Sequence, residues 1–272
     1  MTNENKKVAI LGGGNMGYAL AKGMVASGKY TAENITLTRR NLRSLDGMAK
    51  EGFQVSTDNP AAVAGADIVV LSILPQQLDM VLDSIAEKID PSRHLLISIV
   101  TGVTVQDIRN RIGKEVEVVR AMPNTAIAIR ESMTCITSSK ASPENQALVR
   151  EIFEAVGETV EIGEDMMTPA TALCACGIAF FLRSIRAAAQ GGTEIGFHAK
   201  EALHMAAQTA KGAAALLLQN QSHPENEIDK VTSPKGCTIA GLNEMEHYGF
   251  SSAMIKGIKT SSQKAEQLYH KD

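Results

Sequence analysis

A polar loop that leads into a helix is the first segment of this chain with the residue types for chemistry. Residues 229–242 read Asp-Lys-Val-Thr-Ser-Pro-Lys-Gly-Cys-Thr-Ile-Ala-Gly-Leu. Ser233 and Thr238 supply hydroxyl groups, and Gly236 lets the backbone approach a ligand closely. The first amides of a helix have no intrahelical partner and carry a partial positive charge. The segment therefore predicts a small anion site that fits a carboxylate, although Ser or Thr before a helix is also typical of an ordinary cap.

A glycine-rich turn near the N-terminus predicts a dinucleotide site. Residues 7–11 form a short apolar run, and residues 12–17 read Gly-Gly-Gly-Asn-Met-Gly before a helical pattern. Gly12 permits the tight turn, Gly14 lets the backbone approach a pyrophosphate, and Gly17 lets the helix pack close to the strand. The residues assigned to the cofactor from this segment are Gly12, Gly14, Asn15, Met16 and Gly17.

The end of the second expected strand selects the dinucleotide. The run 34–38 is followed by Arg39 and Arg40, at the place where an acidic residue would bind the ribose hydroxyls of NAD. A guanidinium suits a 2′-phosphate, whereas the alternative is a solvated basic helix start. We expect NADPH as the cofactor and NADH as the less favoured one.

Polar loops follow two further strands and should gather at one rim. Leu74, Pro75 and Gln76 follow one strand, and Met-Pro-Asn-Thr at 122–125 follows another. Asn124 offers a donor and acceptors that suit a nicotinamide carboxamide or a bound water, although Pro-Asn alone is typical of a turn. We assign these three rim residues and Asn124 to the cofactor site.

Alternating strands and helices must position these loops. Expected strands are 8–11, 35–38, 67–73, 94–99, 117–120 and 135–137, and expected helices are 14–27, 41–51, 59–65, 76–88, 105–111 and 143–156. The alternation predicts a mostly parallel sheet with helices on both faces. Ligands would then bind outside the carboxyl ends of the strands.

After about Glu164 the strand patterns stop. Helices are expected at 169–191, 198–219, 238–248 and 250–269, with a loop at 219–234. We therefore expect a Rossmann-type α/β domain at residues 1–164 and an all-α dimerisation domain at 165–272. The runs 180–182 and 213–218 are more apolar than one small bundle needs, which indicates helices shared between subunits or else a simple buried core.

Composition narrows the class of protein. The chain has 272 residues, 44% of them hydrophobic, and a net charge of −3 with acids and bases interspersed. This balance disfavours nucleic acid as a partner. The polar N-terminus lacks a signal-peptide pattern, and no apolar run is expected to reach membrane-spanning length. We expect no membrane partner and a cytoplasmic location.

The cysteines and histidines show no metal-binding pattern. The four cysteines, Cys135, Cys174, Cys176 and Cys237, lack zinc spacing, and the six histidines are scattered. We expect no metal and no disulfide. In the 229–242 loop, the backbone amide of Cys237 is expected to matter more than its sulfur.

Taken together, the two ends of the chain make it resemble the pyrroline-5-carboxylate reductase family over essentially its whole length. The segments that carry the resemblance are 12–20, Val-Arg-Ala-Met-Pro-Asn-Thr at 119–125, and 229–242. The resemblance implies an N-terminal Rossmann domain and a helical dimerisation domain. It also implies intertwined dimers that often assemble further, with each active site between one subunit's cofactor domain and its mate's helical domain.

The implied reaction is hydride transfer from NADPH to the C5=N bond of L-1-pyrroline-5-carboxylate, which gives L-proline. On this resemblance, Ser233 and the amides of Cys237 and Thr238 hold the substrate carboxylate, beside Gly236. The Thr238 hydroxyl contacts the ring nitrogen and is the catalytic group. Such a reaction needs positioning and exclusion of water more than a strong general acid.

Four departures from the family pattern bear on substrate affinity and identity. Leu74 stands where the family usually has Lys, and Ala126 stands where it has Pro. Cys-Ala-Cys-Gly-Ile-Ala at 174–179 replaces a Ser-Gly-Ser-Gly-Pro-Ala run, and Lys235 replaces the first glycine of a pair.

Two other functions stay open at the level of sequence. A β-hydroxyacid dehydrogenase of similar plan would need a helical lysine as proton donor, and Lys200 and Lys211 are the candidates. A non-catalytic nucleotide-sensing regulator could use the same fold. Neither lysine lies in a recognisable catalytic motif.

Overall fold

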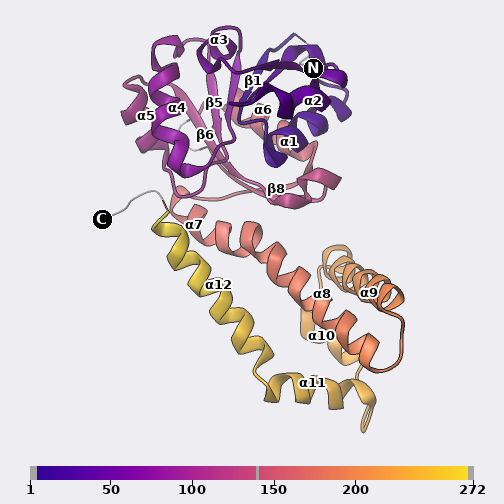
Figure 1. Ribbon diagram of the computed structural model, residues 1–272. Helices are drawn as coiled ribbons and strands as arrows, with labels where there is room; N and C mark the ends of the chain where they lie inside the picture. The colour runs from indigo at the N-terminus through magenta and orange to yellow at the C-terminus, as the bar shows by residue number, and fades with distance from the viewer. Residues whose placement is uncertain (1–4, 139–140, 269–272) are drawn as a thin grey trace. The chain divides into compact units, whose positions relative to one another are not determined.

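The structure, a computed structural model, describes residues 5–138 and 141–268. The chain divides into two compact units, Met1–Cys176 together with Ser261–Asp272, and Gly177–Thr260 (Figure 1). The first unit contains the sheet, and the second is built from helices.

An eight-stranded sheet forms the centre of the first unit, in the order β3-β2-β1-β4-β5-β6-β7-β8. The strands are β1 Val8–Leu11, β2 Ile35–Thr38, β3 Gln54–Ser56, β4 Ile68–Leu71, β5 Leu95–Ser98, β6 Glu117–Met122, β7 Ser132–Thr137 and β8 Gly157–Glu161. Neighbouring strands run parallel except β6 and β7, which are antiparallel. The expected mostly parallel sheet is confirmed.

Helices cover both faces of this sheet, as expected. They are α1 Asn15–Ala26, α2 Asp46–Lys50, α3 Asn59–Ala64, α4 Leu78–Ile85, α5 Val105–Ile112, α6 Pro143–Glu154 and α7 Met167–Ala170. Successive side chains of a strand point to opposite faces, so Ile10 belongs to the core under α1 and α6, whereas Ala9 and Leu11 belong to the core under α3, α4 and α5. The inner strands are therefore apolar throughout.

The two outermost strands, β3 and β8, were absent from the sequence prediction. β3 has only three residues, and the side chains of β8 are half-buried or exposed. An edge strand with one neighbour and little burial needs no apolar run. Such strands form because a neighbouring strand offers hydrogen-bonding groups, which local sequence does not reveal.

Two expected helices are shorter than predicted. The stretch 41–51 becomes a 3-10 turn at Leu42–Leu45 followed by the five-residue α2, and α4 is flanked by 3-10 turns at Pro75–Gln77 and Ala86–Lys88. Asn41 starts the first of these turns, because its side-chain oxygen accepts a hydrogen bond from the Arg43 amide.

The second unit contains α8 Gly177–Glu194, α9 Ala199–Asn220, α10 Pro224–Lys230, α11 Cys237–His247 and the larger part of α12 Phe250–Glu266. The expected helix 169–191 is interrupted by a π-helical segment at Thr171–Cys176, before α8. The prediction of a loop at 219–234 is wrong at Pro224–Lys230, where α10 forms. That helix is polar and short, and it forms through Pro224 in its first turn and a cap in which His223 Nδ1 accepts the Glu225 amide.

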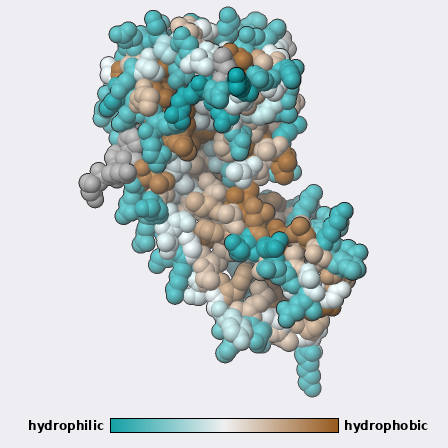
Figure 2. Space-filling model, in the orientation of Figure 1, coloured by the Kyte–Doolittle hydropathy of each residue, from teal (hydrophilic) through white to brown (hydrophobic). Residues whose placement is uncertain are grey.

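Large apolar side chains are exposed on the second unit. Ile195 and Leu218 expose 78% and 80% of their surface, and Phe181 and Leu182 on α8 are also exposed. Figure 2 shows apolar colours along these helices. The unit by itself therefore leaves uncovered an apolar surface that a soluble monomer rarely presents.

One stretch, Glu164–Glu194, is helical, long and apolar enough to cross a membrane by length and composition. The expectation that no apolar run reaches that length was therefore wrong. The stretch reaches it because apolar residues, Phe180, Phe181 and Leu182 among them, recur along one long helical segment. A helix covered by a second copy of the chain meets the same criteria.

Candidate active site

A cleft of about 1080 Å³ opens at the carboxyl ends of β1, β2 and β4 in the first unit. Seven of the residues expected at the cofactor site line it, namely Gly12, Gly14, Asn15, Met16, Arg39, Arg40 and Leu74. The rule that ligands bind at the carboxyl edge of a parallel sheet thus locates a cleft large enough for a dinucleotide.

The surroundings of the three glycines in the turn differ, and so does the structural role of each. Gly12 has a φ of +109°, and a Cβ there would lie 2.0 Å from the carbonyl oxygen of Ser72. A Cβ at Gly17 would lie 2.3 Å from the carbonyl oxygen of Gly12, so α1 packs close to the strand. A Cβ at Gly14 would meet nothing within 4 Å, which leaves open space at the start of α1.

The N-terminus of α1 suits an anion. The N-cap residue Gly14 has no side chain to bond the first amides of α1. Among the described residues, the first turn of α1 contains no acid. The first amides of the helix therefore face the open space beside Gly14 with their partial positive charge. A pyrophosphate fits this arrangement.

The end of β2 holds the turn in place. The Thr38 carbonyl accepts the amides of Gly13 at 2.7 Å and Gly12 at 3.2 Å. The buried Thr38 hydroxyl donates to Asn59 Oδ1 at 2.6 Å. Arg39 and Arg40 follow directly, exposed in the cleft wall.

Asp58 and Asn59 also line the cleft, and the sequence reading had missed them. The Asp58 carboxylate is engaged at the start of α3, where its Oδ1 accepts the Ala61 amide at 2.9 Å. Asp58 thus caps α3. The loop that carries it follows β3, where the Ser56 carbonyl accepts the Arg39 amide at 3.1 Å. The available signal is Asp-Asn-Pro at 58–60, which is typical of a helix start, but its place beside the cleft depends on β3, which local sequence does not reveal.

The structure places only some of the other expected rim residues in the cleft lining. Leu74 lines the cleft and is exposed, but Gln77 lines it in place of Pro75 and Gln76. The 3-10 turn at Pro75–Gln77 explains the shift, because it advances the chain by a tighter step than an extended loop does. Gly17 lies beneath the turn and outside the lining.

Asn124 is buried and its side chain is occupied within the first unit. Its Oδ1 accepts the Ala126 amide at 3.0 Å and caps the 3-10 helix Thr125–Ile129, while its Nδ2 donates to the Cys174 carbonyl at 3.3 Å. Asn124 is not among the residues that line the cleft. The role at the nicotinamide stays a prediction.

The polar loop before α11 lies in the second unit. The Gly236 amide donates to the Ser233 carbonyl at 2.9 Å and closes a tight turn, in which Lys235 has a left-handed φ of +59°. A Cβ at Gly236 would lie 2.9 Å from that same carbonyl oxygen, so glycine fits the turn best. α11 begins at Cys237, one residue earlier than expected, which makes Thr238 its second residue.

The hydroxyls of this loop do not cap the helix in the described structure. Gly236 is the N-cap residue, and α11 has no side-chain cap among the described residues and no acid in its first turn. Ser233 and Cys237 are exposed and Thr238 is half-buried. No Ser or Thr side chain caps α11 among the described residues, and the binding of an anion by these hydroxyls and first amides stays a prediction.

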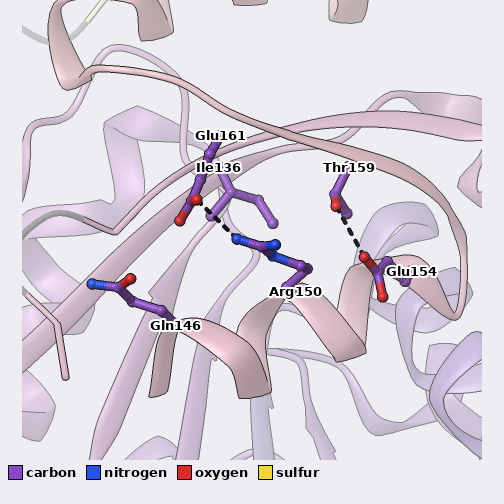
Figure 3. Close-up of a pocket in the computed structure, with 6 residues that line it drawn as sticks. All are labelled: Ile136, Gln146, Arg150, Glu154, Thr159 and Glu161. Carbon is purple, nitrogen blue, oxygen red and sulfur yellow. Dashed lines mark hydrogen bonds and ion pairs between the residues drawn. The ribbon is translucent and has the colours of Figure 1, made fainter. Parts of the chain in front are cut away.

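A second hollow, of about 180 Å³, lies between α6 and the edge of the sheet (Figure 3). Its charged side chains are satisfied by their neighbours. Arg150 Nη2 donates to Glu161 Oε2 at 2.8 Å, and the Thr159 hydroxyl contacts Glu154 Oε1 at 3.5 Å. In the described parts of the chain, no cluster of three or more His, Cys, Asp or Glu residues could hold a metal.

Two family models match the chain. A model described as pyrroline-5-carboxylate reductase dimerisation matches residues 164–268, and one described as NADP oxidoreductase coenzyme F420-dependent matches residues 7–102. The second range contains the glycine turn, both arginines and all the residues that line the cleft.

Curated relatives match along the whole chain. Pyrroline-5-carboxylate reductase 2 of Dictyostelium discoideum is 47% identical over 97% of this chain and 93% of its own length. Pyrroline-5-carboxylate reductase 1 of the same organism is 54% identical over 96% of this chain, and the chain spans 50% of that longer protein.

Solved structures match as well. The Plasmodium falciparum pyrroline carboxylate reductase with NADP bound has a TM-score of 0.90 and 25% identity, with 98% of this chain and 99% of that chain covered. The pyrroline-5-carboxylate reductase from Coxiella burnetii has a TM-score of 0.89 and 28% identity over 98% and 99% of the two chains.

Proposed function

Because this chain belongs to the pyrroline-5-carboxylate reductase family, we propose that it reduces L-1-pyrroline-5-carboxylate to L-proline with NADPH, the last step of proline biosynthesis. The observation that carries the proposal is the cleft of about 1080 Å³ that joins the glycine turn to Arg39 and Arg40. When bound, NADPH supplies a hydride to C5 of the imine.

The cleft fits NADPH at both ends of the adenosine half. The open space at Gly14 and the first amides of α1 suit the pyrophosphate. We expect the 2′-phosphate at Arg39 and Arg40, and Asp58, the only carboxylate among the described residues that line the cleft, is turned to the start of α3. The guanidinium charge therefore favours NADPH over NADH.

We place the substrate at the start of α11. The Ser233 hydroxyl and the amides of Cys237 and Thr238 hold the carboxylate, and Gly236 keeps the turn free of a side chain. The Thr238 hydroxyl donates to the ring nitrogen and orients the imine. Each charge-assisted hydrogen bond of this kind contributes about 1.5–3 kcal/mol.

We further propose that the functional unit is a homodimer or a larger homo-oligomer formed through residues 165–272. The matched model concerns dimerisation, and the exposed apolar side chains of α8 and α9 need a cover. The same cover accounts for the apolar stretch Glu164–Glu194 without a membrane. Light scattering should find no stable monomer, and a fully active monomer at assay concentration would refute this assembly.

We also propose that the cofactor domain is residues 1–164, that the location is cytoplasmic, and that neither nucleic acid nor a membrane is a partner. The net charge of −3, with both signs interspersed, supports the absence of a polyanion partner.

The deciding experiment follows the absorbance of NADPH in three reactions. L-1-pyrroline-5-carboxylate should give turnover with L-proline as the product, whereas β-hydroxyacid substrates with NADP+ and a blank without substrate should give none. Turnover of the hydroxyacids alone would indicate a dehydrogenase. NADPH binding without turnover of any substrate would indicate a nucleotide-sensing regulator.

A further inference from the structure

Two thiols lie side by side in the first unit, away from the residues that line the cofactor cleft. Cys135 Sγ, on β7, lies 3.8 Å from Cys174 Sγ, in the π-helical segment Thr171–Cys176. Cys135 is 3% exposed, whereas Cys174 is half-buried. Cys174 is therefore the more accessible residue of the pair, and Cys135 is the enclosed one.

The surroundings are apolar on the inner side. Met122, Met167 and Ala170 form a small buried cluster with Cys135, and Cys174 packs against that cluster. A disulfide needs the sulfurs about 2.05 Å apart, which is an approach of less than about 2 Å from the contact distance. Cys174 lies in a single π-helical segment, where the backbone ladder is wider than in an α-helix.

We propose that Cys174 is a site of oxidation by hydrogen peroxide and that Cys135 resolves it into an intramolecular disulfide. The Cys174 sulfur attacks one peroxide oxygen, the O–O bond breaks, and a sulfenic acid and water form. The Cys135 sulfur then attacks the Cys174 sulfur, the S–O bond breaks, and a second water leaves. The two sulfurs together lose two electrons, and the peroxide gains them.

The chemistry of the pair favours this order. The hydrogen bond with Cys135 lowers the pKa of the Cys174 thiol to about 7. The same hydrogen bond, together with burial, raises the pKa of the Cys135 thiol. A thiolate is the nucleophile toward peroxide, and the half-buried Cys174 therefore reacts first.

The disulfide would act on the segment that holds Asn124. The Cys174 carbonyl accepts a hydrogen bond from Asn124 Nδ2 at 3.3 Å, and Cys135 pairs with Met122 across β6 and β7. A covalent link between Cys135 and Cys174 would join the π-helical segment to β7, beside the contact between Asn124 and the Cys174 carbonyl. The oxidised protein should resist unfolding at a higher temperature than the reduced protein, because the link closes a loop of 39 residues.

The test treats the full-length protein with hydrogen peroxide, blocks remaining thiols and maps the peptides by mass spectrometry. The titratable thiols should fall from four to two, with a Cys135–Cys174 linkage that dithiothreitol reverses. The Cys176→Ala variant is the matched control and should form the same linkage. Four unchanged thiols, a linkage of Cys174 to Cys176 or Cys237, or overoxidised Cys174 without a linkage would each overturn the proposal.

A second variant separates the two roles. In Cys135→Ala, peroxide should leave a sulfenic acid on Cys174 that dimedone traps, whereas Cys174→Ala should show no dimedone adduct at Cys135. Circular dichroism checks that both variants fold, and peptide mapping of the wild-type protein decides the question if either does not. A dimedone adduct on Cys135 in Cys174→Ala would show that the order of attack is wrong.

Discussion

Arg120 on β6 is buried against Glu164, with Nη1 3.3 Å from Oε1. Their side chains are 5% and 30% exposed. The same Glu164 oxygen accepts the Val105 amide at 2.7 Å, at the start of α5. Burial lowers the pKa of Arg120, and the nearby carboxylate raises it. Glu164 therefore compensates a buried charge and joins the β6 end of the sheet to the first turn after β8.

Removal of this carboxylate should destabilise the first unit. We expect Glu164→Ala to lower the free energy of unfolding by about 2–4 kcal/mol, because the Arg120 charge stays buried without the Glu164 carboxylate. The partial exposure of Glu164 limits the loss. Glu164→Gln keeps an acceptor and should cost less. Urea denaturation measures both, and a wild-type midpoint for Glu164→Ala would contradict the role of the pair.

Glu117 should contribute stability that depends on pH. Burial raises its pKa, but hydrogen bonds from the Asn145 side chain at 2.7 Å and from Ser142 outweigh it and leave the pKa below its usual value. A lowered folded pKa gives stability that is present above the unfolded value of about 4.3 and is lost as pH falls through the folded pKa. The stability difference between the wild type and Glu117→Gln should therefore shrink below about pH 4. A constant difference from pH 7 to pH 3 would show that Glu117 acts by shape alone.

Arg39 should set the preference for NADPH. Arg39→Asp places a carboxylate where the 2′-phosphate is expected, so kcat/KM should fall for NADPH and hold or rise for NADH, by roughly tenfold or more in their ratio. Arg43→Asp changes the charge equally outside the cleft lining and is the control. Initial rates with the two cofactors at equal concentration measure the effect. Wild-type enzyme that uses NADH at least as well would refute the phosphate site.

The Thr238 hydroxyl should matter for turnover. Thr238→Ala keeps the amide of the second residue of α11 but removes the hydroxyl, so kcat/KM for the imine should fall roughly tenfold, about 1.4 kcal/mol of one oriented hydrogen bond. Ser233→Ala should act mainly on KM, because the carboxylate is held in the ground state and the transition state alike. NADPH affinity, measured by fluorescence titration, should stay unchanged in both variants. Wild-type kinetics in a folded Thr238→Ala protein would move the substrate site elsewhere.

Lys235 is strained in a position that glycine accepts freely. Its φ is +59°, and a left-handed conformation costs a non-glycine residue about 1–2 kcal/mol. Glycine also gains about 0.5–1 kcal/mol of unfolded-state entropy, which offsets part of this. Lys235→Gly should therefore leave the thermal midpoint equal or slightly higher, whereas Lys235→Val should lower it. Equal midpoints for Gly and Val at this position would show that the turn tolerates either conformation.

Local spacing predicted much of the molecule. Gly12 and Gly17 lie between one strand and the helix that follows it, and six residues of sequence sufficed to place them, although the backbone that excludes a Cβ at Gly12 belongs to Ser72. The inner strands were predicted because both faces of each are buried, and burial shows as a continuous apolar run. The short strands β3 and β8 escaped prediction, since a neighbour and not their own sequence makes them strands.

What only the tertiary structure decided are contacts between residues distant in sequence. Asn124 is held by the Cys174 carbonyl, and Cys135 lies against Cys174 across 39 residues. Residue types alone predict that a thiol or a carboxylate is present. Its partner, burial and protonation depend on which other element packs against it, and that is settled by the free energy of the whole fold and not by neighbours along the chain.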